Sequence, residues 1–312
     1  MASVEINTQE QPGSTSSEGT PVLRFDQVTV RFDDRPALID VSFAVKAGET
    51  RVVLGAAGSG KTVMLKTSLG LICPDAGRMY LLGQDITNRR EEELYDLRRC
   101  AGVLFQEGAL FDSLTVAENV AYPLLNQGGK QLSESEVQAR VKEALDFVGL
   151  GDVMQKFPSE LSGGMRRRVG IARAGVTRPA LTLYDSPTAG LDPITAYPIV
   201  TLIIRQRDTS NTTSMVVTYR YQDGHLLANY IHDPRTGKLI RSGNIQRRTT
   251  FLVVREGRVV FEGSEAELQS STDPYVAKFA GKKAPPEQRT EGSPRSNASG
   301  VLQPGQIPAG SP

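Results

Sequence analysis

The eight residues Gly55–Thr62, GAAGSGKT, constrain the fold more than any other part of the chain. They fit the pattern G-x-x-x-x-G-K-[ST] in full, directly after the short apolar run Thr50–Leu54 and at the start of the helix-like run Lys61–Ile72. A glycine-rich turn placed in this way directs successive backbone amides inward, and the helix N-terminus adds positive potential. The loop therefore predicts an α/β domain that binds the phosphates of a nucleotide.

Two side chains of this loop, and one from elsewhere, have separate expected tasks. Lys61 would bridge the β- and γ-phosphates, and Thr62 would give its hydroxyl oxygen to Mg²⁺. Asp185 ends the apolar run "LTLYD" and is expected to hold the same ion, usually through water. The residues expected to surround the phosphates are Gly55, Gly58, Ser59, Gly60, Lys61 and Thr62.

A second glycine pair stands before an arginine-rich helix in "LSGGMRRRVGIARA", residues 161–174. Ser162, Gly163 and Gly164 make this a second anion-binding helix N-terminus in one chain. One nucleotide does not need two such ends from the same molecule. The sequence therefore predicts a dimer, in which these three residues of one copy close over the phosphate held by the other.

Strand and helix patterns alternate between residues 21 and 281, which predicts a mainly parallel sheet covered on both faces. Ser133 and Glu136 form a capping box that opens an amphipathic helix. The mostly helical stretch 91–178 is interpreted as an inserted subdomain. The polar residues 1–20 and the Pro/Gly/Ser-rich residues 282–312 are predicted to be disordered.

The composition indicates which kinds of partner the chain can bind and whether it can enter a membrane by itself. A net charge of +1 gives no electrostatic basis for binding nucleic acid, so none is expected. No run approaches the ~18 apolar residues of a membrane helix, and the N-terminus lacks a signal peptide's pattern. Cys73 and Cys100 fit no metal-ligand spacing and are expected to be free thiols. The chain is therefore expected to reach a membrane only by docking to a partner.

In the order of these motifs the chain resembles the nucleotide-binding subunit of ATP-binding cassette (ABC) transporters over about residues 22–270. Gly55–Thr62 is similar to that family's Walker A loop, Asp185 to its Walker B aspartate and Leu161–Met165 to its signature. The resemblance implies an α/β P-loop NTPase of ABC type, with a mainly parallel sheet, an antiparallel β-subdomain and an inserted helical subdomain.

The same resemblance implies ligands, partners and a location. The ligands are ATP and Mg²⁺, and the reaction is hydrolysis of ATP to ADP and phosphate. The partners are a transmembrane permease and a second cassette, in a homodimer or in a heterodimer with another ABC subunit. The implied location is cytoplasmic, on the inner (plasma) membrane through the permease.

Further residues take roles from the resemblance. Gln106 matches the Q-loop glutamine, which senses the γ-phosphate and Mg²⁺ and contacts the permease, while Gly190–Asp192 matches the D-loop. Phe32 matches the aromatic residue that stacks on adenine. The run "LFQEGALFDSLTVAENVAYPL", together with Met165 closing the signature, is similar to the Mla/Mce lipid-trafficking branch. This finer resemblance implies a permease for phospholipids or other hydrophobic molecules.

Two positions depart from the family pattern, and both bear on hydrolysis. Ser186 stands where the family has a glutamate, and Tyr219 stands where it has a switch histidine. A serine hydroxyl cannot accept a proton near pH 7, and loss of a general base costs ~10²–10⁴ in rate. Tyrosine, with an unperturbed pKa near ~10, lacks the dual donor and acceptor character of imidazole.

Three alternatives follow. The chain hydrolyses ATP with a modified site, in which Glu107 is the nearby acid that could substitute. Alternatively, it binds ATP without turnover and completes the site of a competent partner subunit. The third alternative is a soluble non-transport ABC protein, although such proteins typically carry two cassettes. The segment after Tyr219 is also longer than in the family, and its "HDPRTGKL" predicts a turn between two strands.

Overall fold

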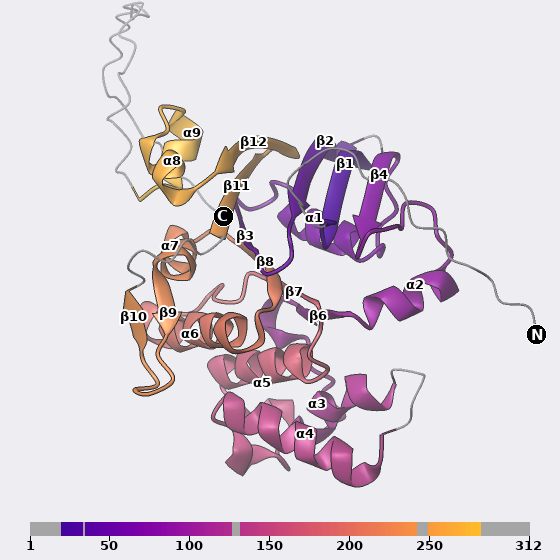
Figure 1. Ribbon diagram of the computed structural model, residues 1–312, viewed down its shortest axis with the longest axis vertical. Helices are drawn as coiled ribbons and strands as arrows, with labels where there is room; N and C mark the ends of the chain where they lie inside the picture. The colour runs from indigo at the N-terminus through magenta and orange to yellow at the C-terminus, as the bar shows by residue number, and fades with distance from the viewer. Residues whose placement is uncertain (1–19, 34, 127–131, 242–248, 282–312) are drawn as a thin grey trace, which may run out of the picture.

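The computed structural model describes residues 20–33, 35–126, 132–241 and 249–281. Residues 1–19 and 282–312, which make up nearly all of the two ends predicted to be disordered, lie outside this part. Figure 1 shows an antiparallel sheet and a group of helices at opposite ends of the molecule, with a second sheet between them. Among the described helices, none has both the length and the apolar character needed to cross a membrane.

The central sheet has six strands in the order β12-β11-β3-β8-β7-β6. From β11 to β6 each neighbouring pair is parallel, and only the pairing of β11 with β12 is antiparallel. The strands are β3 (Thr50–Gly55), β6 (Ala101–Leu104), β7 (Leu181–Asp185), β8 (Thr213–Thr218), β11 (Thr249–Arg255) and β12 (Arg258–Gly263). The mainly parallel sheet is thus confirmed, and its strands end together where ligands bind in such sheets.

The second sheet is antiparallel, in the order β2-β1-β4-β5. Its strands are β1 (Leu23–Phe32), β2 (Arg35–Val45), β4 (Ala76–Leu81) and β5 (Gln84–Asp85). Helix α1 (Lys61–Ser68) buries Met64 and Leu65 in a core shared by this sheet and by Val53 of β3. The neighbouring residues Val52 and Leu54 belong to the other core, so β3 is buried on both faces, as a central parallel strand requires.

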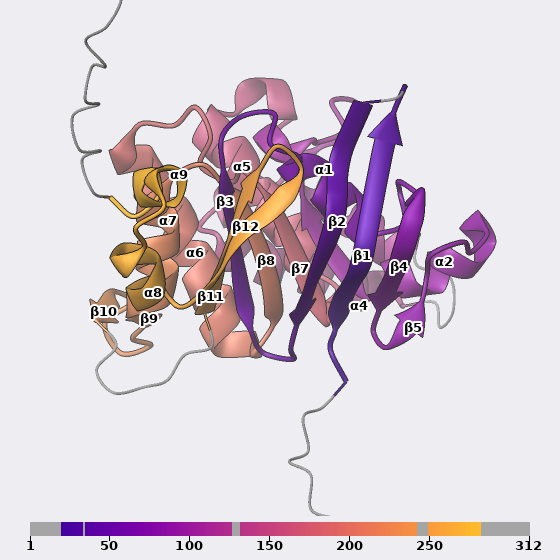
Figure 2. The same ribbon diagram turned by 90° about the horizontal axis from the view of Figure 1, so that it is seen from above.

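The helices of the other core cover the opposite face of the central sheet (Figure 2). Helix α4 begins after Ser133, whose hydroxyl accepts the Glu136 amide while the Glu136 carboxylate accepts the Ser133 amide, so the predicted capping box is confirmed. Helix α2 (Glu91–Arg98) packs with α1 in the first core. The helices of the second core are α3 (Val116–Leu125), α4 (Glu134–Phe147), α5 (Gly163–Gly175), α6 (Pro193–Ser210), α7 (Tyr221–Asn229), α8 (Glu265–Ser270) and α9 (Pro274–Lys278).

The stretch 91–178, expected to be mostly helical, contains one strand of the central sheet. Residues Ala101–Leu104 form β6, which pairs in parallel with β7. Four residues are too few to show a strand pattern in sequence, so only the pairing reveals this strand. The helices that stand apart from the sheet therefore begin after β6, and a boundary of the helical subdomain beyond Leu104 fits the structure better.

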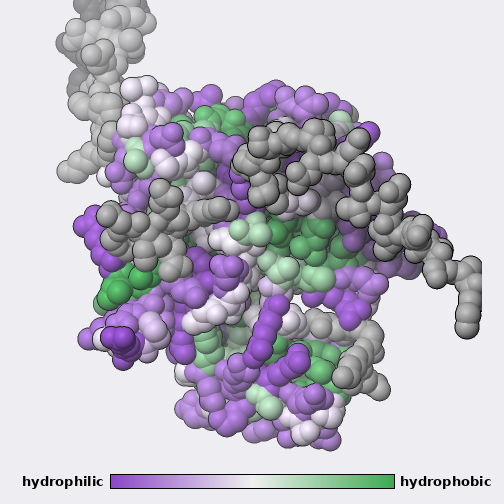
Figure 3. Space-filling model, in the orientation of Figure 1, coloured by the Kyte–Doolittle hydropathy of each residue, from purple (hydrophilic) through white to green (hydrophobic). Residues whose placement is uncertain are grey.

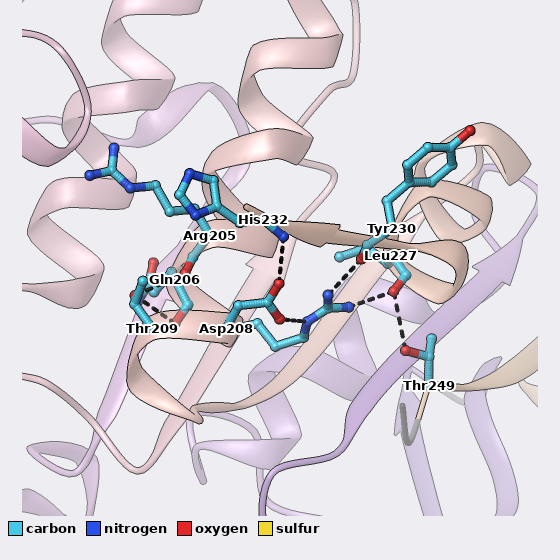
Figure 4. A network of polar contacts seen from close by, with 9 residues as sticks. Arg205, Gln206, Asp208, Thr209, Leu227, Tyr230, His232 and Thr249 are labelled. Atoms are coloured by element: carbon cyan, nitrogen blue, oxygen red, sulfur yellow. Dashed lines mark hydrogen bonds and ion pairs between the residues drawn. The ribbon is translucent and has the colours of Figure 1, made fainter. Parts of the chain in front are cut away.

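The long segment after Tyr219 forms α7 and a hairpin of β9 (Tyr230–His232) and β10 (Leu239–Arg241), with the predicted turn between the two strands. A buried ion pair on α6 anchors it (Figure 4). Arg207 donates to the carbonyls of Leu227 and Tyr230, and Asp208 accepts the amide of His232. The hairpin is thus attached to the domain core by buried charge.

Candidate nucleotide-binding site

The Lys61 ammonium lies inside the loop that precedes α1. Its Nζ donates to the carbonyl oxygens of Gly55 and Ala56 at 2.9 and 2.7 Å and lies 3.3 Å from Ser59 Oγ. Burial lowers the pKa of Lys61, and the nearby Asp185 carboxylate acts in the opposite direction. The loop therefore holds a desolvated cation at the place where the sequence predicts phosphate binding.

The glycines of this loop are required by its close packing. A Cβ at Gly60, where φ is 104°, would lie 2.5 Å from the Ala37 carbonyl oxygen on β2. A Cβ at Gly55 would lie 2.5 Å from the Val254 carbonyl oxygen. Gly58 has a φ of 74° with open space around it, so its requirement is conformational. The loop is thus fixed between β2 and β11.

Asp185 and Thr62 offer the oxygen atoms that a magnesium ion prefers. Asp185 is 3% exposed at the end of β7, and its Oδ1 accepts the Ser186 hydroxyl at 3.2 Å. Thr62 is exposed in the first turn of α1. A carboxylate and a hydroxyl are hard oxygen donors, so the residues present fit Mg²⁺.

The two residues that depart from the family pattern lie beside this centre. Ser186 has a φ of 50°, and its amide donates to the Val217 carbonyl on β8 at 2.8 Å. Tyr219 follows β8 directly, is 51% exposed, and accepts the Gly190 amide through its hydroxyl at 3.5 Å. The two histidines do not replace Tyr219, because His225 lies on α7 against Glu265 and His232 lies on β9.

Gln106 opens a single helical turn directly after β6, and its side chain is exposed. The next three residues all have positive φ, namely 61° at Glu107, 91° at Gly108 and 43° at Ala109. Arg173 of α5 donates to the Gly108 carbonyl at 2.8 Å. This strained turn is thus held in place by α5, the helix that begins within the signature residues Leu161–Met165.

Ser162, Gly163 and Gly164 form the N-terminus of α5, where the Ser162 hydroxyl accepts the Met165 amide at 3.2 Å. In the described residues no hydrogen bond joins this end to Gly55–Thr62. The arginines of α5 each donate to the backbone carbonyl of a different loop. These pairs are Arg166 with Leu161, Arg167 with Ala189, Arg168 with Val148 and Arg173 with Gly108.

Phe32 is the last residue of β1 and is 48% exposed. It pairs with Arg35 at the end of the hairpin that β1 forms with β2. The strand β2 then passes the loop at Ala37, next to Gly60. Phe32 therefore lies on the hairpin whose second strand passes the phosphate loop, which is compatible with the expected adenine contact.

Two side chains that the sequence did not single out also support the site. The Tyr275 hydroxyl on α9 accepts the Ala56 amide at 3.2 Å and donates to the Val254 carbonyl at 3.0 Å. Asp223 on α7 is 2% exposed and accepts the hydroxyls of Thr188 and Thr218. Tyr275 lies 219 residues from Ala56, so no local pattern could have identified it.

Residues 38–189 match the family model described as "ABC transporter". The chain is 41% identical over 207 residues to the probable ribonucleotide transport ATP-binding protein Mkl of Mycobacterium tuberculosis, a match that covers 65% of this chain and 57% of that relative. It is 36% identical over 262 residues to the chloroplastic protein TRIGALACTOSYLDIACYLGLYCEROL 3 of Arabidopsis thaliana, covering 80% and 70% of the two chains.

Among solved structures, the chain is similar to the ATP-binding cassette MJ0796, determined as a dimer in a post-hydrolysis state bound to ADP and Pi. The TM-score is 0.65 at 28% identity, with 78% of this chain and 98% of that chain covered. The chain therefore belongs to the ABC transporter family and carries that family's ATP-binding cassette.

Proposed function

We propose that this chain is the ATP-binding subunit of an ABC transporter, which uses ATP to drive a separate membrane permease. The observation that carries the proposal is Lys61, a buried ammonium held by loop oxygens beside the Asp185 carboxylate. On nucleotide binding, the β- and γ-phosphates take the place of the carbonyls of Gly55 and Ala56 as partners of Nζ. Thr62 and Asp185 would hold Mg²⁺, which would neutralise charge on those phosphates.

The complete site needs two cassettes. Gly55–Thr62 and Asp185 supply one half of it, while Ser162–Gly164 supplies a helix N-terminus, exposed at Ser162, that is suited to a phosphate on another copy. Phe32 contacts adenine, and Gln106 contacts the γ-phosphate and the ion. The partner cassette is a second copy of this chain or a different ABC subunit.

The ATP hydrolysis that this chain catalyses at its own site is proposed to be slow. The Ser186 hydroxyl is already engaged with Asp185, and Tyr219 presents a phenol hydroxyl in place of an imidazole. Neither group removes a proton from water at neutral pH, but positioning and charge stabilisation by Lys61 remain. A partner subunit with its own glutamate and histidine, completed by Ser162–Gly164 of this chain, is the second candidate arrangement.

An apolar surface beside the Gln106 turn is the proposed permease-docking face. Its exposed members are Tyr95, Phe111, Tyr122 and Leu125. The rings of Phe111 and Tyr122 lie 4.6 Å apart, and Figure 3 shows hydrophobic surface beside the position of α3. Arg173 stacks on Phe111 and also holds the Gly108 carbonyl, so this face is physically connected to the turn that carries Gln106.

The proposed cargo is a lipid or another hydrophobic molecule. One relative's name contains a glycerolipid, whereas the name of the other refers to ribonucleotide transport. The permease, and not this subunit, selects the cargo, so relatives with similar cassettes can serve different cargo. The proposed location of the chain is the cytoplasmic side of the inner membrane, which it reaches through its permease.

Replacing Lys61 with alanine is expected to weaken ATP binding by about 10- to 150-fold. The lost charge-assisted hydrogen bonds to phosphate are worth about 1.5–3 kcal/mol. Titration with a fluorescent ATP analogue measures this effect, and Mg²⁺-dependent phosphate release measures turnover. Lys66→Ala is the control, because Lys66 is an exposed lysine on the same helix. Equal affinity of the Lys61→Ala variant and the unmodified chain would refute nucleotide binding at this loop.

A further inference from the structure

The segment Thr188–Leu191 connects β7 to α6, and a different side chain holds each of its four residues. Two of these side chains come from the turn after β8, one comes from α7 directly behind that turn, and one comes from the signature helix α5. The pairs are Thr188 with Asp223, Ala189 with Arg167, Gly190 with Tyr219 and Leu191 with Arg220. The position of this segment is therefore set jointly by α5 and by the turn that carries Tyr219.

Arg167 is the contribution of α5, and its guanidinium is buried where three loops meet. The residue is 6% exposed, its Nη2 donates to the Ala189 carbonyl, and its Nε is buried without a hydrogen-bond partner in the described residues. Burial lowers the pKa of Arg167, while the charge of Glu107 raises it, which places Glu107 within its field. A buried cation with an unsatisfied donor is costly, so a purely structural residue here would be a poor choice.

The same guanidinium also reaches the N-terminal end of α5. A Cβ at Gly163 would lie 3.6 Å from Arg167 Nη1, so the cation lies beside the residues that face a phosphate of the partner cassette. A displacement of this helix end moves the Ala189 carbonyl through Arg167. That carbonyl is next to Gly190, which contacts the Tyr219 hydroxyl.

We propose that Arg167 is a positioning residue that couples the nucleotide site of its own chain to the site that its helix completes in a second copy. The proposal rests on the ATP-driven dimer proposed above. Occupation of the partner's site orders Ser162–Gly164, and Arg167 transmits this order to Thr188–Leu191 and Tyr219. Binding of the two nucleotides is then cooperative.

The test compares Arg167→Gln, Arg167→Lys and Arg168→Gln with the unmodified chain. Arg168 is the matched control, because the next residue of the same helix donates to a carbonyl at the end of α4 and not to Ala189. Two quantities are measured with Mg²⁺-ATP: the Kd of the dilute monomer for a fluorescent ATP analogue, and the dimer dissociation constant by sedimentation. The Hill coefficient for ATP is measured at one fixed chain concentration, at which both the monomer and the dimer are populated.

In Arg167→Gln the monomer Kd is expected to stay within about twofold, while the dimer dissociation constant rises about 10-fold and the Hill coefficient falls to one. Arg167→Lys keeps the charge, so it is expected to restore part of the dimer affinity and part of the cooperativity. Arg168→Gln is expected to change neither the dimer dissociation constant nor the Hill coefficient. Wild-type dimerisation and cooperativity in Arg167→Gln would overturn the proposal. Equal losses in Arg167→Gln and Arg168→Gln would overturn it as well, by showing a structural role. Unmodified chain that binds ATP without dimerising refutes this coupling but leaves the proposed nucleotide site standing.

Discussion

Replacing Ser186 with glutamate is expected to raise the rate of ATP hydrolysis by about 10²- to 10⁴-fold, because it restores a general base beside Asp185. Ser186 follows Asp185 at the end of β7, and its side chain already reaches that carboxylate, so an acid at this position lies beside the expected magnesium ligand. Ser186 has a Cβ and already adopts a backbone φ of 50°, so its replacement with glutamate adds little backbone strain.

Ser186→Gln is the matched control, since glutamine has the size of glutamate but cannot accept the proton. Steady-state phosphate release is measured for both variants, with the rate of Lys61→Ala subtracted as background. Adding Tyr219→His to Ser186→Glu is expected to raise the rate further, because imidazole can donate and accept at neutral pH. Equal rates for Ser186→Glu and Ser186→Gln would refute the assignment of position 186.

Rapid ATP hydrolysis by the unmodified chain would instead support the alternative in which the chain hydrolyses ATP with a modified site. Glu107 is then the acid to test, since it is exposed in the strained turn after β6 and its charge acts on Arg167. In that case Glu107→Gln is expected to lower the rate about 10²-fold or more, as for loss of a general base. Unchanged turnover in Glu107→Gln would exclude this acid.

The features that could be predicted from the sequence are those whose physical signal is local. Gly55–Thr62 is one continuous loop, and its strand and helix neighbours adjoin it, so its structure follows from eight residues. Asp185 ends a wholly buried strand, which shows as an apolar run. The capping box at Ser133 spans four residues, and its hydrogen bonds form within them.

The features that could not be predicted depend on contacts between distant residues. The sequence shows α5 only as an arginine-rich helix, whereas several of its arginines hold backbone carbonyls that lie 20 to 65 residues away. Strand β6 is defined by its pairing with β7 and not by its four residues. Ser162–Gly164 and Gly55–Thr62 belong to one site only when two copies meet, so one chain shows each half separately.

Arg207 offers the largest expected effect on stability. Its side chain is 5% exposed, its Nε donates to Asp208 Oδ1 at 2.8 Å, and its Nη2 donates to the Tyr230 carbonyl at 2.8 Å. Arg207→Met removes one partner of a buried ion pair and takes the Arg207 charge away from Asp208. The free energy of unfolding is expected to fall by about 3–5 kcal/mol, which urea unfolding measures.

Arg178→Met provides the comparison, because Arg178 pairs with Glu143 where both side chains are at least 67% exposed. An exposed pair contributes about 0–1 kcal/mol, so this variant should unfold almost as the unmodified chain does. In the double variant Arg207→Met/Asp208→Asn the loss should be smaller than in Arg207→Met alone, since the buried carboxylate charge of Asp208 is then removed together with the Arg207 charge. Because Asp208 also accepts the His232 amide, the hairpin β9–β10 should lose its protection from hydrogen exchange first in Arg207→Met. Equal stability of Arg207→Met and Arg178→Met would show that this pair does not anchor the hairpin.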